Sequence, residues 1–124
     1  MLRRTALSIA AAVTLALAAP ASAQKAGPNG GVVYSKAGHD AELVIAPSDL
    51  TIFLSHDGKP ESTTGATLKA VIQQGGSNTS VAFADVDGKK LVAKLGAPLA
   101  PGAIVVVTGK DHHGDVISLR HVVK

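Results

Sequence analysis

Residues 39–56 read HDAELVIAPSDLTIFLSH, two runs of strand-forming residues on either side of the segment Pro47-Ser48-Asp49. Proline fixes its own φ angle, and serine and aspartate side chains bond to nearby backbone groups, so all three favour turns. The pattern therefore predicts a β-hairpin with strands at 39–46 and 50–56.

The same pattern continues along the rest of the chain. Short runs of strand formers are separated by turn residues at intervals of about ten residues, which is typical of a β-sandwich or a β-barrel. The sequence therefore predicts an all-β domain in which no helix is needed. The expected strands are 31–36, 39–46, 50–56, 66–73, 79–86, 89–95, 103–109 and 115–123.

Individual runs show features that support this assignment. Leu68, Ala70 and Ile72 alternate with Lys69 and other outward-facing residues, as expected of a strand with one buried face. The Asp87-Gly88 dipeptide suits a type I′ turn, which needs positive φ at both central positions, and predicts a hairpin between 79–86 and 89–95. The run 104–107 is Ile-Val-Val-Val, which does not alternate and predicts a central strand buried on both faces.

The N-terminal 23 residues have the three parts of a secretory signal. A basic start with Arg3 and Arg4 is followed by an apolar run from Ala6 to about Ala19 and a small-residue terminus at Ala23. A membrane anchor is the alternative, but the apolar run is shorter than the roughly 20 residues that span a bilayer. We expect residues 1–23 to be a cleaved signal peptide, 24–30 a flexible lead-in, and 31–124 one exported domain without a membrane insertion, in a bacterial periplasm.

Charge and cysteine content narrow the possible functions. Without Arg3 and Arg4 the basic and acidic residues nearly balance, and no Lys/Arg cluster remains, so nucleic-acid binding is not expected. The chain has no cysteine, and its one methionine is Met1, so disulfides and thiolate or thioether metal sites are excluded from the processed chain. A metal site would have to use imidazole, carboxylate, hydroxyl or backbone groups.

Sequence signatures of enzymes are missing. The chain has no Gly-rich phosphate loop, no G-x-S-x-G elbow and no H-E-x-x-H motif. A Ser-His-Asp triad stays open as an alternative, because its members need not be close in sequence. We expect a protein that binds and does not catalyse, with no catalytic residue to name.

Five histidines are the most informative polar residues, because neutral imidazole is a common ligand of Zn(II) and Cu(II). Pairing Leu43 with Ile52 in the 39–56 hairpin sets His39 opposite His56, and a register slipped by two leaves them diagonal. In both registers the imidazoles share one face at the open end of the hairpin, within cross-strand reach. Asp57 is close by, and so is Glu42, although Glu42 should point to the opposite face.

These residues predict a solvent-open Cu(II) or Zn(II) site at the rim of the sheet, with His39 and His56 as nitrogen ligands and Asp57 and Glu42 as oxygen ligands. The alternative is that the two histidines are polar strand ends that bond to backbone. His112 and His113 would form a weaker accessory site or a solvent-exposed turn, since adjacent rings do not easily face one ion. His121 has the parity of Leu119 and is expected to pack at the edge of the core.

The order of several short motifs resembles a known family. They are Gly30-Gly31, His39-x-x-Glu42-Leu43-Val44, His56-Asp57-Gly58-Lys59-Pro60, Gly65-Ala66-x-Leu68 and Pro101-Gly102-Ala103. The chain resembles small periplasmic proteobacterial proteins with this pattern, and is similar to the N-terminal extension of membrane-fusion subunits in heavy-metal efflux pumps. The resemblance covers essentially the whole chain after residue 23.

The resemblance implies an Ig-like antiparallel β-sandwich of seven or eight strands and an association with copper, zinc or heavy-metal resistance. His39, Glu42, His56 and Asp57 match the family's most distinctive polar positions. Two residues depart from the pattern: Asn29 stands where a histidine often precedes Gly-Gly, and His121 stands where an aromatic residue is usual.

Together these observations predict a periplasmic protein that reversibly binds Cu(II) or Zn(II). The alternative is a structural or adaptor module that contacts an efflux or envelope protein through a sheet edge and has no ligand of its own. A third reading, a small hydrolase, would require turnover of ester or peptide substrates.

Overall fold

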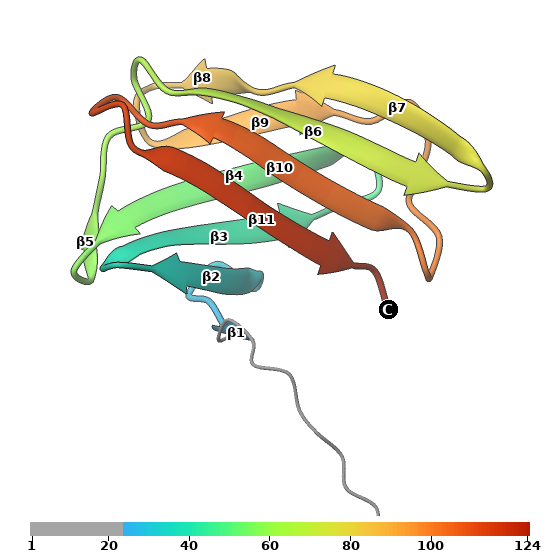
Figure 1. Cartoon of the computed structure of the whole chain (residues 1–124), viewed down its shortest axis with the longest axis horizontal. Helices are drawn as coiled ribbons and strands as arrows, with labels where there is room; N and C mark the ends of the chain where they lie inside the picture. Colours follow the sequence, from blue (N-terminus) through green and yellow to red (C-terminus); the bar gives the residue numbers. More distant parts are fainter. Residues whose placement is uncertain (1–23) are drawn as a thin grey trace, which may run out of the picture.

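The computed structural model describes residues 24–124, so the expected signal peptide at 1–23 lies outside the described residues. These residues form an all-β fold without a helix, as the sequence predicts, with eleven β-strands where seven or eight were expected (Figure 1). The strands are β1 (Gln24–Ala26), β2 (Val32–Lys36), β3 (His39–Ile45), β4 (Asp49–His56), β5 (Lys59–Pro60), β6 (Thr67–Gln74), β7 (Ser77–Ala82), β8 (Ala84–Val86), β9 (Lys90–Lys94), β10 (Ile104–Lys110) and β11 (Val116–Val122).

The strands are arranged in two antiparallel sheets. One has seven strands in the order β1-β2-β3-β4-β9-β8, with β5 paired to β4, and the other has four in the order β11-β10-β6-β7. Figure 1 shows the smaller sheet lying across the larger one, with the core between them. The arrangement is a two-layer β-sandwich, and within residues 24–124 no helix could cross a membrane.

The 39–56 hairpin has the predicted register. Leu43 lies opposite Ile52, and His39 lies opposite His56, which excludes the slipped alternative. Leu43, Leu50 and Ile52 are fully buried against the second sheet. Burying each of these side chains contributes about 1.5–3 kcal/mol, which holds the register because a slip of one residue would turn them all toward solvent.

Two predictions about strands were incomplete. The expected strand 79–86 breaks at Phe83, and its two parts join different sheets: β7 pairs with β6, while β8 pairs with β9. The buried Phe83 marks this crossing, and its amide N–H donates to the carbonyl of Leu68. Short strands also form at β5 and at β1, inside the segment expected to be a flexible lead-in, because β1 pairs with β2.

The run 104–107 was predicted to be a central strand buried on both faces. The central position is confirmed in β10, but burial on both faces is not. The strand β10 is central in its sheet, between β11 and β6, as expected. Val105 and Val107 are fully buried toward the core, but Val106 on the other face is only half-buried. A two-layer sandwich covers one face of each sheet, so the uninterrupted valine run does not mean burial on both faces.

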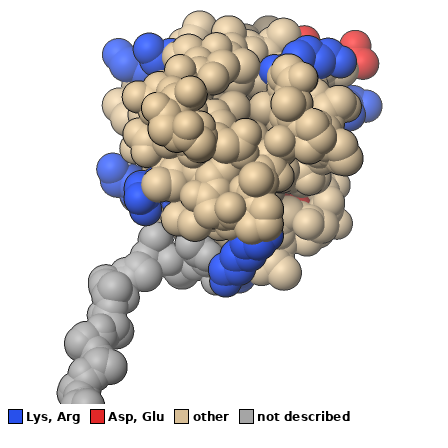
Figure 2. Space-filling model, turned by 90° about the vertical axis from the view of Figure 1, so that its right-hand side faces the viewer, with Lys and Arg blue, Asp and Glu red and all other residues tan. Residues whose placement is uncertain are grey.

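Asp87 and Gly88 form the predicted tight turn between β8 and β9, with φ angles of 55° and 66°. Figure 2 shows the end of the sandwich at the β6–β7 turn. Most of its surface is uncharged, and basic and acidic side chains lie at its margin. The acidic residues and histidines that matter below lie at the opposite end.

Candidate metal-binding site

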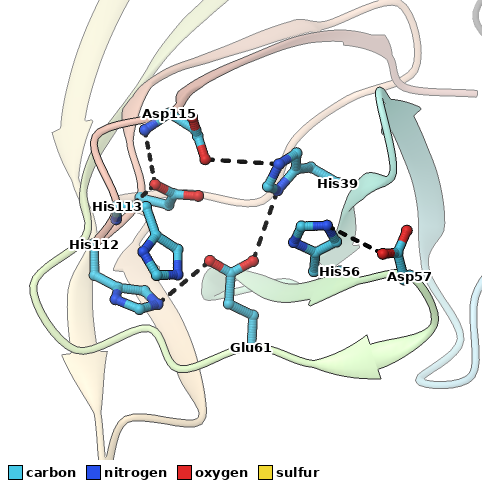
Figure 3. A network of polar contacts seen from close by, with 8 residues as sticks. His39, His56, Asp57, Glu61, His112, His113 and Asp115 are labelled. Carbon is cyan, nitrogen blue, oxygen red and sulfur yellow. Dashed lines mark hydrogen bonds and ion pairs between the residues drawn. The ribbon is translucent and has the colours of Figure 1, made fainter.

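Four histidines gather at the end of the sandwich where β3 begins, β4 ends and the loop between β10 and β11 closes over them (Figure 3). They are His39, His56, His112 and His113. Three carboxylates join them from the same end, Glu61, Asp111 and Asp115. The sequence predicts the four histidines as site residues but none of these three carboxylates.

His39 and His56 lie directly opposite each other in β3 and β4, with ring centroids 4.2 Å apart. Both have the parity of buried core residues, since His39 follows the face of Ala41 and His56 that of Leu54. Their rings therefore extend the inner face of the sheet to its open end, where 30% of the His39 side chain and 46% of the His56 side chain are exposed. The predicted pairing of the two imidazoles on one face is confirmed.

Glu61 lies between the imidazoles of His39 and His112, and the β4–β5 hairpin places it there. His56 pairs with Lys59 and Ser55 with Pro60, so Glu61 continues this register and its N–H donates to the carbonyl of Leu54. Glu61 therefore shares the inward face of Leu54. Its Oε1 lies 3.9 Å from His39 Nδ1, and its Oε2 lies 3.4 Å from His112 Nε2.

The surroundings of Glu61 are unusual for a carboxylate. Only 9% of its side chain is exposed, and within residues 24–124 no lysine or arginine lies within 4.0 Å of it. Its Oε2 is buried without a hydrogen-bond partner, and so is His39 Nδ1. Buried polar atoms are normally hydrogen-bonded, so unpartnered atoms on two side chains that face each other indicate a ligand-binding position.

The loop at 111–115 is fixed by Asp111. The side chain of Asp111 is buried, and its Oδ1 accepts hydrogen bonds from the N–H groups of His113 at 2.9 Å and Asp115 at 2.8 Å. Burial tends to raise the pKa of Asp111, but these two backbone bonds, a bond with Glu61 and the charge of His113 together lower it. The turn is exposed at His112 and His113, as expected, and Asp111 holds it so that both histidines face Glu61.

These side chains form three overlapping groups whose nitrogen and oxygen atoms lie within 4.8 Å of one another. The groups are His39, His56 and Glu61; Glu61, His112 and His113; and His39, Asp111 and Asp115. Two ligands of a tetrahedral Zn(II) ion are about 3.3 Å apart, given metal–ligand distances of about 2.0–2.1 Å. The separations at Glu61 are close to this value, and the donor atoms are those that Zn(II) and Cu(II) accept.

Asp57 lies on the side of His56 that faces away from Glu61 (Figure 3). Its Oδ2 is 3.3 Å from His56 Nε2, and 76% of its side chain is exposed. Asp115 is placed in the same way relative to His39, because Asp115 Oδ2 lies 3.6 Å from His39 Nε2. Carboxylates placed in this way orient a metal-binding imidazole and leave its other nitrogen, Nδ1, for the metal. Asp57 was predicted as an oxygen ligand, and the structure places it outside all three groups.

Glu42, also predicted as an oxygen ligand, lies on the outer face of the sheet. Its buried carboxylate accepts bonds from the N–H groups of Asn29 and Gly31 at 2.9 and 2.8 Å and from the Asn29 side-chain amide at 2.9 Å. It belongs to none of the three groups. Glu42 anchors the loop between β1 and β2 through Asn29 and Gly31.

His121 is half-buried in β11, away from the other histidines. Its Nδ1 is 2.6 Å from the Tyr34 hydroxyl, and the two rings meet edge to face with centroids 6.1 Å apart. Burial and then the charge of Lys124 lower the pKa of His121, and burial raises the pKa of Tyr34. This position agrees with the expected packing role at the edge of the core.

Comparison of the chain with protein-family models, with curated proteins and with solved structures gave no match.

The site opens into a groove of about 810 Å³ between β2–β3 and β11. Its walls combine apolar side chains such as Tyr34 and Leu54 with polar residues of the site, among them His39 and Glu61. The groove gives solvent access to the site, so an ion can enter and leave without the sandwich opening.

Proposed function

We propose that this protein reversibly binds a Zn(II) or Cu(II) ion through His39, His56 and Glu61, as a non-catalytic periplasmic protein of metal resistance or homeostasis. The observation that carries the proposal is the pair of buried atoms without hydrogen-bond partners, Glu61 Oε2 and His39 Nδ1. They belong to a buried carboxylate and an imidazole whose facing atoms, Oε1 and Nδ1, are 3.9 Å apart.

The energetics favour a cation at this place. Burying a carboxylate without a cationic partner costs several kcal/mol, and here Glu61 is accompanied by imidazoles and by the carboxyl group of Asp111, with no lysine or arginine. A divalent ion would offset this cost and would be ligated by both neutral imidazoles. Because thiolates and thioethers are missing, the donor set favours Cu(II) or Zn(II) over Cu(I), with Cu(II) bound more tightly.

Calorimetric titration of the metal-free protein with Zn(II) and Cu(II) tests this proposal. We expect micromolar or tighter binding at the His39–His56–Glu61 site, which the His39→Ala/His56→Ala variant loses even where it keeps an ion bound elsewhere. The His121→Phe variant should retain this binding, because His121 lies outside the site. Binding unchanged in the double variant, or no binding by the wild type, would reject the proposal.

A second candidate function, partner binding through a sheet edge, is favoured by the strand β11. It is the edge strand of its sheet, and it carries the two exposed large apolar residues of the described chain, Val116 and Val122. An extended segment of an efflux or envelope protein would add to such an edge. Substituting Val116 by Lys should weaken that contact and leave metal binding intact, whereas the His39→Ala/His56→Ala variant should do the reverse.

A further inference from the structure

We propose that this end of the sandwich binds two divalent ions, with the carboxylate of Glu61 bridging them. The inference rests on the proposed function and adds a second site, formed by Glu61, His112 and His113. The ligand class of this second site is the same, a Zn(II) or Cu(II) ion.

The two oxygens of Glu61 face different imidazoles. Oε1 lies 3.9 Å from His39 Nδ1, on the side of the His39–His56 pair. Oε2 lies 3.4 Å from His112 Nε2, on the side of the His112–His113 pair, as Figure 3 shows. A carboxylate with an imidazole pair beyond each oxygen is the arrangement of a two-metal site, in which the ions are about 3.5–4 Å apart.

The unpartnered buried atoms also divide between the two sites. An ion held by His39, His56 and Glu61 Oε1 would satisfy His39 Nδ1 and leave Glu61 Oε2 buried without a partner. The group of Glu61, His112 and His113 has its ligand atoms within 4.8 Å of one another. A second ion there would satisfy Oε2, so one ion resolves only half of the unpaired atoms.

The local charge is consistent with two ions. Asp57, Glu61, Asp111 and Asp115 lie at this end, and the ion pairs that the described residues form there involve histidines and no lysine or arginine. Lys36, Lys59 and Lys110 have backbone positions at the same end, but none of them forms an ion pair with these carboxylates. The four carboxylates therefore have no paired cationic side chain, which favours the binding of divalent cations.

The second imidazole pair is already held in place. His112 and His113 have ring centroids 3.8 Å apart, and the backbone bonds to Asp111 Oδ1 fix the loop that carries them. Little conformational freedom remains to be lost on binding, which favours affinity. The two adjacent histidines lie in an exposed turn, as expected, and their ligand atoms still group with that of Glu61.

Native mass spectrometry of the full chain with Zn(II), and electron paramagnetic resonance with Cu(II), test the inference. Four proteins are compared: the wild type, His39→Ala/His56→Ala, His112→Ala/His113→Ala, and the control His121→Phe. We expect two ions in the wild type and the control, and one ion in each double variant. Two Cu(II) ions this close should give a half-field signal, which each double variant should lose.

Circular dichroism of each variant shows whether it is folded, and both double variants alter half-exposed or exposed side chains. A wild type that binds one ion, lost only in His39→Ala/His56→Ala, would overturn the second site and leave the proposed function standing. Two ions retained by His112→Ala/His113→Ala would also overturn it. No ion bound by the wild type would overturn both proposals.

Discussion

His39 Nδ1 and Glu61 Oε1 lie 3.9 Å apart at the open end of the sandwich, and no lysine or arginine of the described chain approaches either residue closely enough to form an ion pair. Residue 39 begins β3 and residue 61 follows β5, so two separate hairpins bring the atoms together. The separation is slightly larger than that of two ligands on one tetrahedral ion. A shift of a few tenths of an ångström would therefore complete the ligand pair.

Replacing Glu61 by Gln should have opposite effects on stability and on metal binding. In the metal-free protein it removes a buried charge that lacks a cationic partner, so the free energy of unfolding should rise by about 1 kcal/mol. Metal affinity should fall at least about tenfold, equivalent to about 1.4 kcal/mol. Urea unfolding with a chelator and calorimetric titration measure the two effects.

Glu42→Gln is the matched control for this prediction. Glu42 is also buried, but its carboxylate accepts three hydrogen bonds from Asn29 and Gly31. Its substitution should destabilise the protein and leave metal affinity unchanged. If both variants shift stability in the same direction, the unpaired burial of Glu61 is not the cause.

Replacing Asp57 by Asn should weaken metal binding without abolishing it. Asp57 lies 3.3 Å from His56 Nε2 and orients the ring from the side away from Glu61. Loss of such an outer partner typically costs about 10–100-fold in affinity. Asparagine tolerates the positive φ of 51° at this position, so the turn is retained. Complete loss of binding in a folded Asp57→Asn protein would instead make Asp57 a direct ligand.

The sequence predicts the His39–His56 pair but not Glu61, and the reason is local. The pair depends on one hairpin, whose register is fixed by alternating apolar residues that can be matched across the turn. Glu61 depends on the strand β5, which has two residues and includes Pro60. Proline is uncommon inside strands, so no strand was predicted at 59–60. The signal that could have found it is Asp57-Gly58, an Asp-Gly turn like Asp87-Gly88, with φ angles of 51° and 81°.

The meeting of His112 and His113 with Glu61 could not be predicted for a different reason. The loop at 111–115 joins β10 and β11 of the smaller sheet, whereas Glu61 belongs to the larger one. Alternation within a strand shows which face is buried, but it does not show which sheet the strand joins. The break at Phe83, where one predicted strand divides between the sheets, has the same origin.

Replacing Thr63 by Val should destabilise the protein and weaken the site indirectly. Thr63 is fully buried, its hydroxyl donates to Asp85 Oδ1, and its N–H donates to the carbonyl of Gly88. The hydroxyl contact ties the segment carrying Glu61 to the β8–β9 hairpin. We expect a loss of about 1–2 kcal/mol in the free energy of unfolding, because the donor to a carboxylate is removed.

Urea unfolding of Thr63→Val, Asp85→Ala and the double variant measures this contact as a double-mutant cycle. A coupling energy of at least about 0.5 kcal/mol is expected for residues in direct contact. Additive effects of the two substitutions would show that the hydroxyl contact contributes nothing to stability.

His121 should account for part of the loss of stability at acidic pH. Burial and then the charge of Lys124 lower its pKa in the folded state below the ordinary value of 6.5. The unfolded chain therefore takes up this proton at a higher pH than the folded chain. The stabilisation is complete above the unfolded-state pKa and is lost as the pH falls toward the folded-state pKa.

Urea unfolding in the presence of a chelator at pH 8 and pH 5 tests this expectation. The decrease in free energy of unfolding between the two pH values should be smaller in His121→Phe than in the wild type, and an equal decrease would contradict it. Tyr34→Phe removes the 2.6 Å hydrogen bond between Tyr34 and His121, and so separates its effect on the pH dependence of stability from the effect of burial. Burial is the larger cause of the lowered pKa of His121. Tyr34→Phe should therefore lower the free energy of unfolding by about 1 kcal/mol at both pH values and leave the decrease between pH 8 and pH 5 unchanged.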